Sequence, residues 1–289
     1  MRNTRLESAI GLDVGGTSLK LVRIDGSEIA LSRTIPTPGD RETFLATIAQ
    51  ELPPFREAGA PDHPLGIALP GFLDESRRRV VRLSNLPCLD GLDLVDALAK
   101  IGHPGAVLDT DTNAGATAEA VLGAGRDARR VLYVSLGTGL GAALTDGGRP
   151  VRVRNHTVGQ VAFIPIEKRG AEELLCERGI LARAGGRFST ARELSEHAAA
   201  GDPQALHAWR ETGAILGQLL AILCALWQPD IAVIGGGIAH ASEHFLDATR
   251  DELAKAPGPA ARSIELAVAR LLPYSGAIGA ALIARGEMG

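Results

Sequence analysis

The feature that most constrains the fold is a strand–turn–strand unit that occurs twice in the chain. Residues 10–24 (IGLDVGGTSLKLVRI) and 131–144 (VLYVSLGTGLGAAL) are both alternating apolar runs, interrupted by a turn of glycine and threonine. An alternation of period two predicts strands with one buried face, and the turn between them predicts a hairpin. Because the two units are alike and far apart, the sequence predicts two related lobes that each open with a hairpin.

Strand patterns are followed by helix patterns in both lobes, which predicts an α/β protein with mixed sheets. We place the lobe boundary near residue 112, with residues 1–112 in the first lobe and 113–274 in the second. The last segment, 275–289, is a small-residue helix that can return to the first lobe. The predicted elements that bear on a site are strands at 65–69, 80–83, 106–109 and 231–234, and helices at 114–122, 172–184, 203–227 and 243–253.

Composition narrows the classes of function. The net charge of −4 argues against a general nucleic-acid binder, which would carry a basic surface. The three cysteines, Cys88, Cys176 and Cys224, form no CxxC pair, so neither a disulfide framework nor a thiolate zinc site is expected. The N-terminus has no apolar signal region, and the apolar stretch 213–227 is interrupted and short for a bilayer. We therefore expect a cytoplasmic protein with no membrane or nucleic-acid partner.

Three glycine-rich turns, here called the phosphate turns, indicate phosphate binding. They lie at 13–20 (DVGGTSLK), 135–141 (SLGTGLG) and 234–239 (IGGGIA), each beside a predicted strand. Without a Cβ atom, successive backbone N–H groups can approach phosphate oxygens and form an anion nest. Taken singly, each turn is better explained by chain geometry, because turns and strand ends use glycine everywhere, but three of them in two matched lobes are much more specific. Thr17 and Thr138 add hydroxyl donors.

Two common nucleotide motifs do not fit these turns. The GTGLG of residues 137–141 precedes a predicted strand, whereas a Rossmann fingerprint opens a helix. No GxxxxGK[ST] motif is present. Asp13, at the first turn, stands where a carboxylate can hold Mg²⁺ through water, the arrangement that this ion prefers.

A polar cluster at 109–116 (DTDTNAGA) lies between a predicted strand and a predicted helix. A carboxylate there can take a proton from a substrate hydroxyl, or Asp109 or Asp111 can simply cap the helix. For Asp111 the two interpretations are even on their own, and the phosphate turns favour the base. The run Arg77–Arg79 is interpreted as a solvated hairpin tip, with phosphate binding as the less favoured alternative.

The ordered motifs resemble the ROK family (repressor, open reading frame, kinase), which is similar to glucokinases of the actin/hexokinase-like, or ribonuclease H-like, ATPase fold. The resemblance covers about residues 10–284. It implies two lobes with a cleft between them, Mg-ATP as phosphate donor and a hexose or hexose derivative as acceptor. The matching segments are DVGGT at 13–17, Pro70-Gly71, SNLPCLDGLDL at 84–94, DTNAGA at 111–116, SLGTGLGAAL at 135–144, QPDIAVIGGGIA at 228–239 and GAIGAALIA at 276–284.

The resemblance also implies roles for individual residues. Asp111 falls at the catalytic-base position. The expected cofactor contacts are Asp13, Gly15, Gly16, Thr17, Lys20, Gly137, Thr138, Gly139, and, beside adenosine, Gly235, Gly236 and Gly237. The expected sugar contacts are Pro70, Gly71, Asn85, Thr110, Asp111, Thr157, Gln160 and Glu173.

The sugar-binding half departs from the family pattern. Many members carry GExGH followed by CxCGxxGC, in which the histidine and three cysteines bind zinc. We align residues 156–160 (HTVGQ) with the first motif, so that Thr157 replaces the sugar-binding glutamate and Gln160 replaces the histidine. The cysteine cluster is absent, so no structural zinc is expected. We interpret His156 as a surface or loop histidine.

Two further positions also differ or stay ambiguous. Thr110 stands where sugar-phosphorylating members commonly have asparagine. A second sugar-binding glutamate corresponds to Glu173 or Glu172, for which a solvated helix face is an equally good explanation. Because sites built for particular hydroxyls discriminate strongly, these changes predict a sugar other than plain glucose, or weakly bound glucose.

Two other classes of function compete with the kinase. A repressor of this family carries an additional N-terminal helix-turn-helix domain, and here the first phosphate strand begins at Ile10, so DNA binding is not expected. A weak or inactive sensor of sugar or nucleotide would suit the altered sugar motif, but the retained Asp111 and phosphate turns oppose it. The sequence leaves open a donor other than ATP, such as polyphosphate. The resemblance suggests a homodimer.

Overall fold

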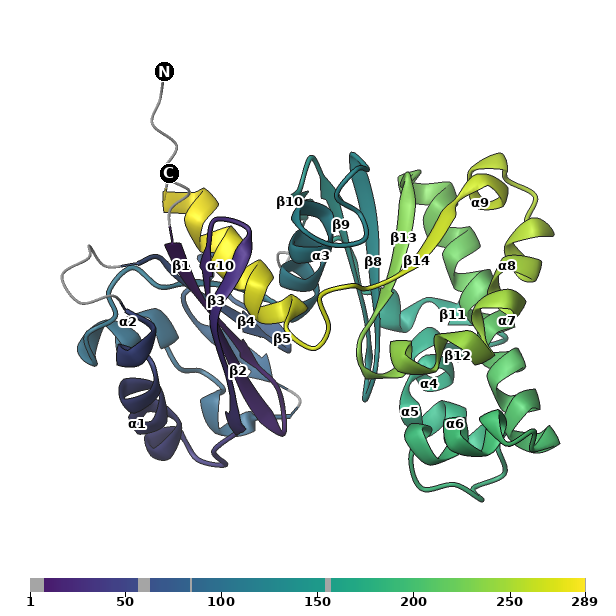
Figure 1. Cartoon of the computed structure of the whole chain (residues 1–289), viewed down its shortest axis with the longest axis horizontal. Helices are drawn as coiled ribbons and strands as arrows, with labels where there is room; N and C mark the ends of the chain where they lie inside the picture. Colours follow the sequence, from purple (N-terminus) through teal and green to yellow (C-terminus); the bar gives the residue numbers. More distant parts are fainter. Residues whose placement is uncertain (1–7, 57–62, 84, 154–156, 289) are drawn as a thin grey trace.

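The structure is a computed structural model that describes residues 8–56, 63–83, 85–153 and 157–288. Two lobes each contain a five-stranded sheet (Figure 1). The first sheet contains β1 (Ser8–Val14), β2 (Ser18–Asp25), β3 (Glu28–Pro36), β4 (Leu65–Leu69) and β7 (Val107–Thr110). The second contains β8 (Arg130–Leu136), β9 (Leu140–Asp146), β10 (Arg149–Pro150), β13 (Ile231–Gly235) and β14 (Glu265–Val268). Two short hairpins pair β5 (Gly71–Leu73) with β6 (Val80–Leu83), and β11 (Pro165–Ile166) with β12 (Arg169–Gly170).

The two large sheets have the same topology. The first has the order β3-β2-β1-β4-β7 and the second the order β10-β9-β8-β13-β14. In each, the first three strands form an antiparallel meander and the last two are added in parallel. The strand–turn–strand units open both sheets, so the expectation of mixed sheets in two related lobes is confirmed.

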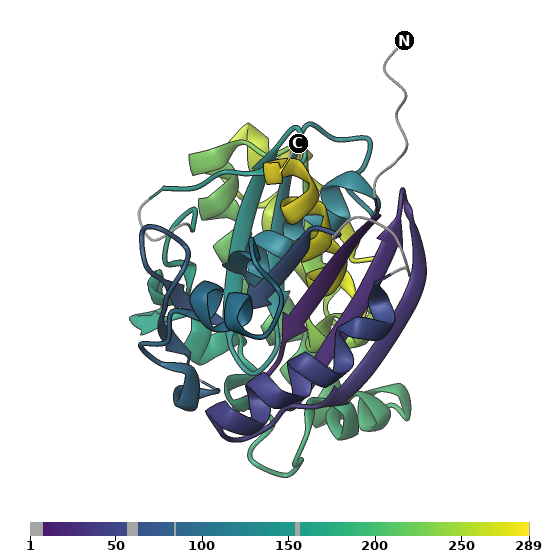
Figure 2. The same ribbon diagram turned by 90° about the vertical axis from the view of Figure 1, so that its left-hand side faces the viewer.

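Helices separate and cover the sheets. In Figure 2, α1 lies across the outer face of the first sheet, and α10 lies behind that sheet. The side chains agree, because Phe44 and Ile48 of α1 join a core with Leu12 and Leu21, whereas Val22 faces α10. The helices are α1 (Arg41–Glu51), α2 (Leu94–Lys100), α3 (Asp111–Val121), α4 (Ala171–Leu175), α5 (Glu177–Arg183), α6 (Ala191–Ala199), α7 (Pro203–Trp227), α8 (Leu246–Ala254), α9 (Pro259–Ser263) and α10 (Ser275–Met288), with 3-10 turns at Pro53–Phe55, Pro87–Leu89, Val161–Phe163 and Gly237–His244.

The helices α3 and α10 fill the space between the sheets (Figure 1). The chain leaves the first sheet through α3 and returns through α10, which packs on β1 and β4. This approach requires glycine, because a Cβ atom at Gly11, Gly66 or Gly279 would overlap a backbone carbonyl of the facing helix. Both lobes therefore rest on one helix pair, and the boundary near residue 112 stays a prediction.

The helix α7 is the central helix of the second lobe. It is longer than the apolar stretch 213–227, and by length and composition alone it could cross a membrane. However, 56% of its most apolar 18-residue segment is buried inside the protein. Trp209 and Leu216 on this helix lie in the lobe's core, and Gly213 and Gly217 allow close approach to α8. These contacts are those of a core helix.

Two helix predictions in the second lobe were wrong in detail. The single helix expected over 172–184 is two helices, α4 and α5, because Cys176 adopts an extended conformation between them. The helix expected from 243 begins at Leu246, and a 3-10 segment precedes it. Local spacing of apolar residues does not record such a break.

Candidate active site

Two adjoining cavities lie where the lobes meet. We call one the Gln160 cavity, about 390 Å³, and the other the Lys20 cavity, about 530 Å³. Asp111 lines both, so its carboxylate stands at their junction. The other residues common to the two linings are Pro70, Asn85, Ser135, Gly137 and Thr138.

The Lys20 cavity collects most of the predicted cofactor residues. Those that line it are Asp13, Gly15, Gly16, Thr17, Lys20, Gly137, Thr138, Gly236 and Gly237. The first phosphate turn is held by a Gly15 N–H that donates to the Ser18 carbonyl over 3.0 Å, and by a Thr37 hydroxyl that donates to the Gly15 carbonyl over 2.7 Å. At Gly236 the backbone has φ of +80°, where a side chain would also collide with Leu136. The glycines thus provide open backbone along this wall.

Two of the predicted cofactor glycines lie elsewhere. Gly139 lines the Gln160 cavity and not the Lys20 cavity. Gly235 is buried and lines neither, because it packs against the ring of Tyr133, which a Cβ atom would overlap. Tyr133 itself lines the Lys20 cavity and was not predicted there, because a tyrosine in an alternating strand predicts only core packing.

Asp111 is the first residue of α3 and is half-buried. Burial raises its pKa to about 7, and the nearby negative charge of Asp13 adds to the effect. The N–H of Thr112 donates to its carboxylate over 2.8 Å and fixes its direction. A carboxylate with a pKa near neutrality is suited to act as a general base. Neither Asp109 nor Asp111 caps the helix, because the Thr110 hydroxyl does so by accepting from the Asn113 N–H.

Asp13 and Lys20 face each other across β1 and β2, with 3.4 Å between the Lys20 Nζ and an Asp13 oxygen. Burial raises the pKa of Asp13, and the charge of Lys20 opposes this. Among the described residues, no three metal-ligating side chains of His, Cys, Asp or Glu gather in one place. The Asp13 carboxylate lines the Lys20 cavity and fits Mg²⁺, which binds through one or two carboxylates, keeps several waters and takes its other ligands from phosphate.

The Gln160 cavity collects the predicted sugar contacts with one exchange. Pro70, Gly71, Asn85, Thr110, Asp111, Thr157 and Gln160 line it. Glu172 also lines it and accepts from the Leu140 N–H over 2.9 Å, whereas Glu173 is exposed and is not part of the lining. Of the two glutamates that the sequence offered in the first turn of α4, the cavity lining therefore favours Glu172 over Glu173. His156 falls outside the described residues.

Two phenylalanines at the Gln160 cavity were not predicted. Phe72 on β5 is 37% exposed, and Phe163 after Gln160 is 70% exposed. Both line the cavity, one from each lobe. Exposed phenyl rings beside polar groups suit a ligand with an apolar face or substituent. The only signal in the sequence is an aromatic residue near each predicted sugar contact.

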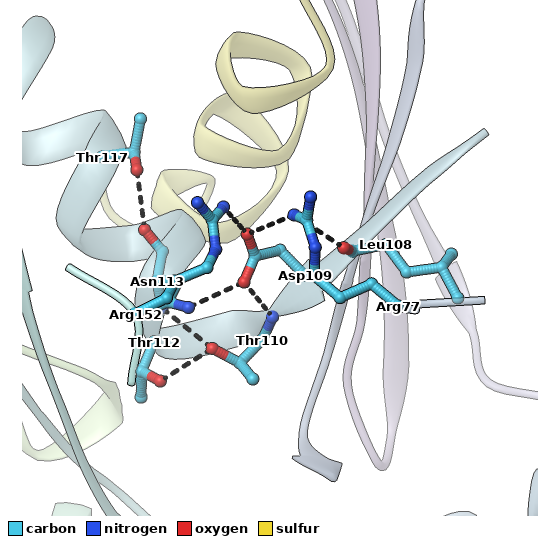
Figure 3. Close-up of polar contacts among 8 residues, drawn as sticks. All are labelled: Arg77, Leu108, Asp109, Thr110, Thr112, Asn113, Thr117 and Arg152. Atoms are coloured by element: carbon cyan, nitrogen blue, oxygen red, sulfur yellow. Dashed lines mark hydrogen bonds and ion pairs between the residues drawn. The ribbon is translucent and has the colours of Figure 1, made fainter. Parts of the chain in front are cut away.

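The prediction that Arg77–Arg79 form a solvated hairpin tip is wrong for Arg77. Its side chain is 21% exposed and donates to the Asp109 carboxylate over 3.3 Å. Arg152, which follows β10, pairs with the same oxygen of Asp109 (Figure 3). Asp109 is only 1% exposed. Its buried negative charge is paired with two arginines that lie far apart in the sequence, Arg77 and Arg152. Arg78 and Arg79 have half-exposed side chains, as expected for a hairpin tip.

Comparison with known proteins agrees with this geometry. A profile of the ROK family matches residues 9–287. The chain belongs to the ROK family. The N-acetylgalactosamine kinase AgaK of Shewanella sp. (strain ANA-3) is 30% identical to this ROK protein over 257 residues, which cover 81% of this chain and 82% of that protein.

Solved structures confirm the actin/hexokinase-like fold that was expected. A ROK hexokinase from Thermus thermophilus has 29% identity and a TM-score of 0.82, covering 97% of this chain and 99% of that one. A ROK family glucokinase from Streptomyces griseus, in complex with glucose and AMPPNP, has 26% identity and a TM-score of 0.83, covering 96% and 99%. The sequence-based expectation of the family and of its fold is therefore confirmed.

Proposed function

We propose that this ROK protein transfers the γ-phosphate of ATP to a hydroxyl group of a hexose derivative, with Asp111 as the general base. The relatives described above are named as sugar kinases, and this supports a sugar kinase here. The observation that carries the finer proposal is the place of Asp111. Its carboxylate joins the Lys20 cavity, which is lined by phosphate turns, to the Gln160 cavity, which is lined by polar side chains.

The chemistry follows from this arrangement. A sugar hydroxyl in the Gln160 cavity gives its proton to Asp111 as its oxygen attacks the γ-phosphate. The bond from the γ-phosphorus to the β–γ bridging oxygen breaks in the same step, and ADP leaves. A positioned base contributes roughly 10²–10⁴-fold to such a step. The N–H groups around Gly15 and Gly137, with Lys20, bind the phosphates and stabilise the charge that develops on them. Asp13 would hold Mg²⁺ through water, and the ion would neutralise part of the phosphate charge. Closure of the lobes on both substrates excludes water and limits hydrolysis of ATP.

The acceptor that we favour is an N-acylated hexosamine rather than plain glucose. Thr157 and Gln160 can form hydrogen bonds but carry no charge, and Glu172 is the acid on this wall. Phe72 and Phe163 offer apolar contact that an acyl group can use. The activity named for the Shewanella relative supports the same class. The proposal includes a cytoplasmic enzyme, no nucleic-acid partner and a homodimer.

The test is ADP release from Mg-ATP with a panel of hexoses, amino sugars, N-acetylated sugars and polyols. Asp111→Asn serves as the inactive control. We expect the native protein to phosphorylate one N-acetylated sugar. The Asp111→Asn control should phosphorylate it at no more than about a hundredth of the native rate. Failure of every sugar, with ATP binding intact, would overturn the kinase proposal and favour a sensor. Turnover of glucose alone would overturn the substrate class.

A further inference from the structure

Asp109 is buried beside the base and joins three segments of the chain. One of its oxygens accepts from Arg77 and from Arg152. The other accepts from the Thr110 N–H over 2.8 Å and from the Asn113 side chain over 2.7 Å. We call Arg77, Asp109, Asn113 and Arg152 the Asp109 cluster (Figure 3). Asn113 lies in the first turn of α3, the turn that begins with Asp111.

Each arginine fixes one wall of the Gln160 cavity. Arg77 lies in the turn between β5 and β6, and Gly71 and Phe72 of β5 line the cavity. Arg152 lies beside Val153, whose N–H donates to the carbonyl of Thr157 over 3.1 Å, and Thr157 lines the opposite wall. The Asp109 cluster therefore ties a wall from each lobe to the strand that ends at the base.

The backbone at Arg77 supports a role beyond surface charge. Its φ is +52°, in the left-handed region that residues with a side chain seldom occupy. Such conformations persist where surrounding contacts hold them, and they concentrate at functional sites. Buried ion pairs add little net stability compared with apolar packing, but they can fix one arrangement against others. Geometry is thus the property that this cluster is suited to control.

We propose that Asp109, held by Arg152 and Arg77, is a positioning residue that sets Asp111 and both walls of the Gln160 cavity in register for phosphate transfer to the sugar. This inference rests on the proposed function. It assigns the cluster to the acceptor side, because Phe72 and Thr157, on the segments that the two arginines hold, line the Gln160 cavity and not the Lys20 cavity. Disrupting the Asp109 cluster should therefore lower kcat/KM for the sugar and leave the KM for ATP unchanged.

The test uses Arg152→Met, because Arg77 remains paired with Asp109 in that variant and we therefore expect the fold to be retained. Arg152→Lys is the conservative variant, and Arg149→Met is the matched control, an exposed arginine on the same segment. We expect Arg152→Met to lower kcat/KM for the sugar 10- to 100-fold, as misplacement by about 1 Å does, with KM for ATP within twofold of native. Arg152→Lys should recover part of this loss, and Arg149→Met should not differ from native.

A second pair of variants separates positioning from folding. Asp109→Asn should lower sugar turnover in the same way, and the double variant Asp109→Asn/Arg152→Met should be no worse than Asp109→Asn, because both act through one contact. Sugar turnover within twofold of native in both single variants would overturn the proposal. So would an equal rise in KM for ATP and for sugar.

Amide hydrogen exchange measures local opening in the same variants and does not require that the protein phosphorylate a sugar. We expect the amides of 110–113 and 157–163 to exchange faster in Arg152→Met than in Arg149→Met. If no sugar is phosphorylated by the native protein, the proposed function has failed, and this measurement alone decides the inference. Unchanged exchange in both segments would then overturn it.

Discussion

Replacing Asp111 by asparagine should make the folded protein more stable at pH 8 while it removes turnover. The side chain keeps its shape, and the Asn oxygen can still accept from the Thr112 N–H. What changes is the charge, because asparagine does not ionise. The native carboxylate is held in a place that raises its pKa from 3.8 to about 7.

The sign and size of the effect follow from proton linkage. Between these two pKa values the folded protein binds more protons at Asp111 than the unfolded chain does, so stability falls as the pH rises. By this linkage the penalty has an upper limit of about 4 kcal/mol at pH 8 and about 1.5 kcal/mol at pH 5. Water in the cavities reduces the penalty at both pH values. We therefore expect Asp111→Asn to raise the free energy of unfolding by about 1–3 kcal/mol at pH 8, and by less than half of that amount at pH 5.

Urea unfolding of the native protein and the variant at the two pH values measures this difference. Asp127→Asn is the control, because its carboxylate is 93% exposed and should give no gain at either pH. A variant at Asp111 that is less stable than native at pH 8, or equally changed at both pH values, would refute the reasoning about this base.

Three further predictions concern the base, the phosphate wall and the helix pair. With a pKa of about 7 at Asp111, kcat/KM for the sugar should fall roughly tenfold from pH 8 to pH 6, and a flat profile would contradict the assignment. Lys20→Met should raise KM for ATP roughly tenfold and leave sugar affinity in place, as measured by initial rates. Gly279→Ala should lower the free energy of unfolding by about 3 kcal/mol or more, because its Cβ atom would overlap the Ala114 carbonyl. Gly286→Ala on the same helix is the control, since its Cβ atom meets no other atom and alanine should stabilise the helix slightly. Equal unfolding midpoints for the two variants would contradict the packing argument.

Much of the architecture could be predicted because its signals are local. The alternation in 10–24 and 131–144 predicts hairpins, and the fold places both at the same position in matched sheets. Pro203 and Pro229 limit α7 as the sequence suggests. The Asp111 position is also local, since a strand, a polar turn and a helix follow one another there.

The features that could not be predicted depend on partners far away in sequence. Arg77 looks like a surface residue until Asp109, 32 positions away, is seen to accept from it. Gly235 looks like part of a phosphate turn, but Tyr133 of a neighbouring strand covers it. The choice between Glu172 and Glu173 depends on the residue at which the helix begins, and a shift of one position turns the carboxylate out of the cavity.

The most direct test of the central claim is to follow the phosphate itself. We would incubate the native protein and Asp111→Asn with Mg-ATP and N-acetylgalactosamine or N-acetylmannosamine, and record the ³¹P spectrum. The account predicts a new phosphomonoester signal that grows with ADP for the native protein and is absent for the variant. An equal signal from both proteins would contradict the role of Asp111, and no phosphorylated sugar from the native protein with any hexose derivative would contradict the kinase.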